Sequence, residues 1–177
     1  MRSTFTFGIL ALISPLILSG PASAKAATCG VDLQVRFIEG APVDRFVISN
    51  GSSETYPLTQ VAFDLTASKG RLIFDTANGG AGVEVFQPFV STVASVDVRD
   101  GATGLRMPMD GLKAGGEVSF TIDVDDQLTA SELGQIRVSG SEMAGAQVVF
   151  TMNGKPYLAT FDTQNVARIS QTCDDNS

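Results

Sequence analysis

The amino-acid sequence predicts an all-β protein, an antiparallel β-sandwich of about ten short strands with at most one short helical turn. Three observations support this fold class. Apolar and polar residues alternate with a period of two in many segments, as in half-buried strands. Turn signals rich in glycine, proline and asparagine recur about every eight to twelve residues. Helical periodicity is almost absent, so two packed sheets or, as the alternative, one closed barrel would accommodate the strands.

The clearest strand covers residues 118–126. Apolar residues occupy every second position, and serine, threonine and aspartate fill the positions between them. This alternation places Asp123 and Asp125 on the face opposite the apolar side chains. We expect that face to be exposed to solvent, with the other face on the core.

The remaining elements follow from the same alternation and from the turns between them. Strands are predicted at 31–37, 44–50, 58–67, 71–75, 83–87, 93–99, 102–109, 135–139, 147–152, 155–162 and 166–172. Segments 58–67 and 71–75 are expected to form a hairpin, as are the two arms that flank Asp100-Gly101. Asn153-Gly154 is the strongest hairpin signal of the chain. A capping box at 129–132 predicts the one helical turn, and 140–145 is predicted to be an irregular loop.

The first 24 residues predict a secretory signal peptide. A positive residue, Arg2, precedes an apolar run, and Ala22-Ser23-Ala24 provides a cleavage site. Cleavage after Ala26 fits nearly as well. An uncleaved membrane anchor is the alternative, but the run is short and is interrupted by Pro15. Residues 25–177 are therefore expected to form a single domain that is secreted, periplasmic or at the cell surface, with no transmembrane segment after cleavage.

The acidic composition bears on the partners. The formal charge is −7, and it becomes about −8 once the signal peptide with Arg2 is removed. Nucleic acid is excluded as a partner, because its phosphates require Lys and Arg. Solubility outside the cell explains the charge, and a site for divalent cations is the alternative explanation.

Cys29 and Cys173 are the two cysteines, and they lie near opposite ends of the mature chain. In an exported protein such a pair predicts a disulfide, here between the first and the last strand. The chain-entropy model gives an upper estimate of roughly 5 kcal/mol for a loop of this length. The alternative is a lipoprotein acylated on Cys29, although Thr28 stands where a small Gly or Ala is expected.

Asp123, Asp125 and Asp126, where the central strand ends, are candidate ligands of a metal site. Ca²⁺ binds six to eight oxygens, several of them from carboxylates. The segment is not an EF-hand, because Leu128 stands where that loop requires glycine. The alternative is an acidic strand end that prevents edge-to-edge pairing of sheets.

The common catalytic motifs are absent. Histidine does not occur, so the most frequent general base and zinc ligand is missing, and no G-x-S-x-G motif is found. The glycine-rich segment 78–82 is followed by a predicted strand, whereas a phosphate-binding loop leads into a helix. Tryptophan, a frequent platform for sugars, is also absent. We therefore expect no enzyme; the alternative is a carboxylate-dependent hydrolase of extracellular polysaccharide.

Several stretches together resemble exported bacterial proteins labelled aggregation-factor core protein, after the calcium-dependent adhesion complexes of sponges. They are RFIEGAPVDRFVI at 36–48, LIFD at 72–75, GVEVFQPF at 82–89, FTIDVDD at 120–126 and LGQIRVSG at 133–140. The resemblance implies cell adhesion or a matrix role at the cell surface. It favours a non-enzymatic binding module whose partner is an envelope or matrix protein or a polysaccharide, with Ca²⁺ as a possible cofactor.

Overall fold

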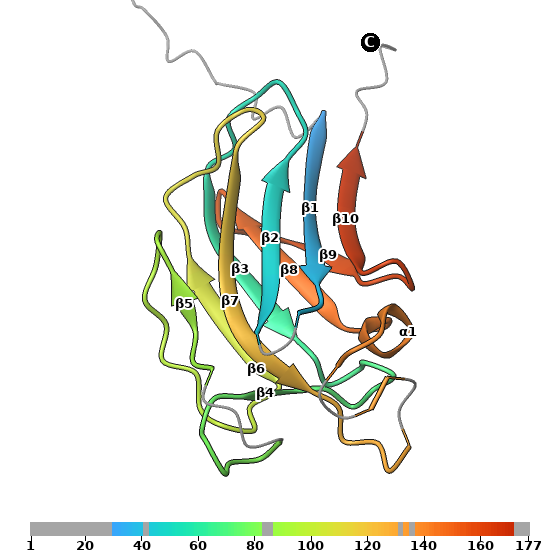
Figure 1. Cartoon of the computed structure of the whole chain (residues 1–177). Helices are drawn as coiled ribbons and strands as arrows, with labels where there is room; N and C mark the ends of the chain where they lie inside the picture. Colours follow the sequence, from blue (N-terminus) through green and yellow to red (C-terminus); the bar gives the residue numbers. More distant parts are fainter. Residues whose placement is uncertain (1–29, 41–42, 83–86, 131–132, 135–136, 172–177) are drawn as a thin grey trace, which may run out of the picture.

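The computed structural model describes residues 30–40, 43–82, 87–130, 133–134 and 137–171. Ten strands form two antiparallel sheets that lie face to face (Figure 1). The first sheet contains β1 (Val31–Ile38), β2 (Asp44–Asn50), β4 (Ile73–Asp75), β5 (Val90–Ser91), β7 (Glu117–Asp125) and β10 (Val166–Gln171). The second contains β3 (Leu58–Asp64), β6 (Gly104–Pro108), β8 (Gln147–Met152) and β9 (Lys155–Thr160). The predicted all-β sandwich is confirmed.

The strand order distinguishes the two sheets. In the first it is β10-β1-β2-β7-β4, with β5 also paired to β7, and in the second it is β6-β3-β8-β9. The first strand therefore pairs with the last, β1 with β10, in the register Val31 to Gln171. The hairpin at Asn153-Gly154 joins β8 to β9, as its sequence predicts.

Phenylalanine side chains connect the two sheets through the core. Phe46 of β2 stacks on Phe120 of β7 with ring centroids 4.9 Å apart. Phe63 of β3, in the opposite sheet, meets both rings edge-on at 5.1 and 5.2 Å. All three rings are buried. Such pairs add to the free energy gained by burying their apolar surface, so the apolar face of β7 is held firmly on the core.

Two predicted hairpins are wrong. Segments 58–67 and 71–75 do not pair, because β3 joins β6 and β8 whereas β4 joins β7 in the other sheet. Residues 93–99 contain no strand, and the turn at Asp100-Gly101 instead leads into β6. Local alternation shows that a segment is extended, but it carries no information on which neighbour supplies the hydrogen bonds.

The helical turn also differs from its predicted position. Helix α1 (Gly140–Met143) lies where an irregular loop was expected, and it begins with a capping box in which Ser139 and Glu142 bond each other's backbone N–H groups. Thr129 and Ala130 are not helical, and the rest of the predicted turn lies outside the described residues, as does most of the predicted strand 83–87. The predicted strand 135–139 is wrong over its described part, because residues 137–139 are not in a strand. The cysteines also lie outside the described residues.

No helix in the described part of the chain is both long and apolar enough to cross a membrane.

Candidate metal centre

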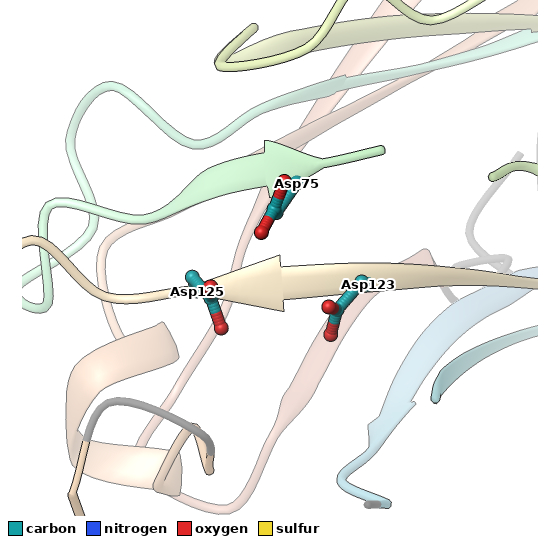
Figure 2. A group of neighbouring side chains, drawn as sticks. All are labelled: Asp75, Asp123 and Asp125. Carbon is teal, nitrogen blue, oxygen red and sulfur yellow. The ribbon is translucent and has the colours of Figure 1, made fainter. Parts of the chain in front are cut away.

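Three aspartates meet where β4 pairs with the end of β7 (Figure 2). The antiparallel register places Asp75 directly opposite Asp123 and Ile73 opposite Asp125. Directly opposite residues share one face of a sheet, and so do residues two apart on one strand. The three carboxylates therefore lie on the same face, and one oxygen from each is within 4.8 Å of the others.

This face is not exposed, contrary to the expectation from the alternating pattern. Asp75, Asp123 and Asp125 are 0%, 6% and 2% exposed, respectively. The opposite face of the same strands carries Phe74 and Val124, which are also buried. Both faces of the sheet are thus covered at this end of β7. A period of two reveals the two faces of a strand, but not whether loops cover the polar one.

Asp75 has the least satisfied carboxylate of the group. Neither of its oxygens has a hydrogen-bond partner among the described residues, although both are fully buried. Burying a carboxylate without a partner is costly, because it loses its hydration and gains nothing in return. Like charges placed directly across an antiparallel pair are destabilising as well. Burial of Asp75 as an anion is therefore costly.

The surroundings raise the pKa values of Asp123 and Asp75. Burial raises the pKa of Asp123 to about 7, and the nearby carboxylates of Asp125 and Asp75 contribute. Burial also raises the pKa of Asp75 to about 6, with contributions from the neighbouring carboxyl groups of Asp100 and Asp125. Without a counter-ion, these carboxyl groups hold protons to a higher pH than exposed aspartates do.

A fourth buried acid, Asp44, lies on β2 beside the same end of β7. Its Oδ1 accepts a hydrogen bond from the N–H of Gly40, and its Oδ2 accepts one from the N–H of Val124. Burial raises the pKa of Asp44 to about 8, and the charge of Asp123 adds to this effect. Because both oxygens of Asp44 have backbone partners, its role is to connect β7 to the β1–β2 turn.

The two described ion pairs lie elsewhere in the molecule. They join Arg137 to Glu39 and Arg168 to Asp32, and neither includes Asp75 or Asp123. A bound cation would supply positive charge beside the three carboxylates.

The predicted metal ligands are only partly brought together. Asp123 and Asp125 belong to the group, whereas Asp126 does not. Oδ1 of Asp126 accepts a hydrogen bond from the N–H of Leu128 at 2.8 Å, just after the end of β7. Its Oδ2 is buried and has no hydrogen-bond partner among the described residues. Asp75 is the residue that the sequence analysis missed. Its only local signal was an acidic residue at the end of the apolar segment 72–75.

The donor set suits a hard divalent cation. Three carboxylates supply up to six oxygens, and Ca²⁺ takes six to eight oxygens at flexible angles, with carboxylates bound through one or both oxygens. Mg²⁺ requires a nearly ideal octahedron and retains several waters, which a buried site accommodates poorly. Soft metals prefer sulfur or imidazole, and the group contains neither.

The cavities described on the surface lie elsewhere. One of them, of about 610 Å³, lies between β3, β6 and the segment 96–99, and two others have volumes of about 450 and 300 Å³. None of the three is lined by Asp75, Asp123 or Asp125. The carboxylates are thus enclosed by the protein and do not line any of these cavities.

Comparison with known protein families, curated proteins and solved structures finds no match to this chain.

Proposed function

We propose that the chain is a non-enzymatic binding or adhesion module of the cell envelope or extracellular matrix, and that Ca²⁺ held by Asp75, Asp123 and Asp125 stabilises its β-sandwich. One observation supports the cation: the carboxylate of Asp75 is fully buried, has no hydrogen-bond partner in the described part of the chain, and lies close to two other buried carboxylates. A divalent cation would supply both the missing ligand interactions and the missing positive charge.

The predicted signal peptide, the acidic composition and the resemblance to aggregation-factor core proteins support the extracellular adhesive role. Calcium concentrations outside cells reach the millimolar range that weakly binding extracellular modules use. The partner would be an envelope or matrix protein or a polysaccharide.

The alternative function, hydrolysis of polysaccharide by a carboxylate pair, receives less support from the geometry. A glycosidase must admit a sugar between its two carboxyl groups. Here the three carboxylates are at most 6% exposed and lie outside the cavities described above. Their raised pKa values, a frequent feature of active sites, also follow from burial and mutual repulsion alone.

The test is thermal unfolding in millimolar Ca²⁺ and in chelator at the same ionic strength. A ligand that binds only the folded state at a hundred times its Kd adds about 2.7 kcal/mol, which raises the Tm by several degrees for a domain of this size. The variant Asp75→Asn should lose this rise. In chelator it should melt above the wild type, because it removes one of three mutually repelling charges.

Asp110→Asn is the matched control, since it removes an equal charge from an exposed position. It should retain the full calcium response. A wild-type Tm that is the same in Ca²⁺ and in chelator would refute the cation site, and so would an equal response in Asp75→Asn.

A further inference from the structure

The glycine-rich segment 78–82 follows β4 in the chain and ends beside the acidic group. Residues 76–82 read TANGGAG and contain no charged side chain. The carboxylate of Asp100 organises this segment: its Oδ1 accepts hydrogen bonds from the N–H groups of Thr76 and Ala77 at 2.9 and 3.1 Å, and its Oδ2 accepts one from Ala81 at 2.9 Å. The segment is therefore folded around a side chain from a distant turn.

The segment ends directly against the candidate metal centre. A Cβ atom placed on Gly82 would lie 2.7 Å from Oδ2 of Asp75 and closer still to Oδ2 of Asp125. Real Cβ atoms do not approach other atoms so closely. The backbone of Gly82 has no positive φ, so space alone, and not backbone conformation, excludes a side chain at this position.

The exposure of the glycine-rich segment also indicates that it covers the carboxylates. Residues 79–82 are exposed, whereas the carboxylates of Asp75 and Asp125 beside Gly82 are almost completely buried. A neutral peptide backbone thus lies between two carboxylates and the solvent. It separates them from water, which strengthens the repulsion between like charges, and a bound cation would offset that repulsion.

We propose that segment 78–82 is the outer wall of the cation site and that Gly82 is the positioning residue that lets this wall close over the carboxylates. The inference rests on the proposed function, because the wall has a purpose only if a cation binds. It adds a regulatory consequence: occupancy of a buried site is transmitted to an exposed loop. Ca²⁺ would hold the loop closed, and loss of Ca²⁺ would release it.

The first test compares two glycine-to-alanine variants by calorimetric titration with Ca²⁺ alone. Gly82→Ala should weaken calcium binding about tenfold or more, a typical effect for groups that support metal ligands. Gly104→Ala is the matched control, because the nearest atom to its added Cβ is the carbonyl oxygen of Phe63 at 3.8 Å, an ordinary contact, and Gly104 also has no positive φ. It should bind Ca²⁺ like the wild type.

The second test needs no variant and remains decisive if Gly82→Ala fails to fold. Hydrogen exchange followed by mass spectrometry should show slower exchange of the amides of residues 76–82 in Ca²⁺ than in chelator, with the β8–β9 turn at Asn153-Gly154 as an internal control that does not respond.

The experiments distinguish a failure of the proposed wall from a failure of the proposed Ca²⁺ site. A wild-type protein that binds Ca²⁺ without protecting residues 76–82 would refute the wall and leave the proposed function intact, and so would a Gly82→Ala variant with wild-type calcium affinity. A wild-type protein that does not bind Ca²⁺ would refute both.

Discussion

The two outer pairings of the first sheet handle acidic side chains in opposite ways. Where β1 pairs with β10, Asp32 accepts two hydrogen bonds of 2.7 Å from the guanidinium of Arg168, and both side chains are partly exposed. Where β4 pairs with β7, three aspartates face one another in a buried position. Hydrogen bonding to Arg168 lowers the pKa of Asp32, whereas burial raises that of Asp123.

The difference identifies the part of the sheet where a bound cation would have the largest effect. The β1–β10 pairing contains its own counter-charge at a partly exposed position. The β4–β7 pairing concentrates carboxylates in a buried position, and the proposed cation would offset their repulsion at neutral pH. The following predictions test this contrast, from the largest expected effect to the smallest.

The largest effect concerns the predicted disulfide at the β1–β10 edge. Val31 pairs with Gln171; Cys29 is two residues before Val31, and Cys173 is two residues after Gln171. A disulfide between them, as the sequence predicts for an exported protein, would close this edge covalently. Replacing both by serine should lower the free energy of unfolding by about 2–4 kcal/mol.

Chemical denaturation of the oxidised protein and of the double variant measures this loss. Mass spectrometry of the unreduced mature protein should identify the linked peptides. Free thiols, or a lipid on Cys29, would show that this edge is held by hydrogen bonds and the Asp32–Arg168 pair alone.

The second effect is the pH dependence of the β4–β7 region in chelator. The folded pKa values of Asp75, Asp123 and Asp44, about 6, 7 and 8, lie above the ordinary value of 3.8. Between pH 4 and 8 the folded state therefore binds more protons than the unfolded state, and stability falls as the pH rises. The Tm in chelator should decrease by several degrees between pH 5 and pH 8.

Saturating Ca²⁺ should reduce this decrease, because the cation replaces the protons on the carboxylates. The control is Asp75→Asn in chelator, for which the decrease should also be smaller. A Tm in chelator that is constant or rises from pH 5 to pH 8 would contradict the repulsion inferred for the three aspartates.

The smallest effect is expected at the exposed ion pair. Asp32→Asn should lower the free energy of unfolding by about 0.2–1 kcal/mol, since both partners are hydrated and the attraction is screened. The loss should shrink further in high salt, whereas the calcium response of the buried site should be retained. Thermal unfolding at low and high ionic strength checks both statements. A loss well above 1 kcal/mol would mean that the β1–β10 edge depends on this pair more than its exposure suggests.

The sequence alone determined the fold class and several of its parts. Alternating apolar residues identified β1, β2, β7 and β8 as strands, and Asn153-Gly154 identified a hairpin, because strand periodicity and turn chemistry depend on residues close together in the chain. Asp123 and Asp125 were recognised as candidate ligands for the same reason, since they lie two residues apart on one strand.

Only the tertiary structure decided which distant residues lie beside Asp123 and Asp125. Asp75 is 48 positions before Asp123 in the numbering, and it reaches the site because β4 crosses to the first sheet and does not pair with β3. The segment that ends at Gly82 likewise lies against Asp75 and Asp125 on the polar face of β7. Asp126 follows the end of β7, and its Oδ1 accepts a hydrogen bond from Leu128. Periodicity specifies the two faces of a strand, whereas strand pairing and loop packing are long-range choices that specify what covers each face.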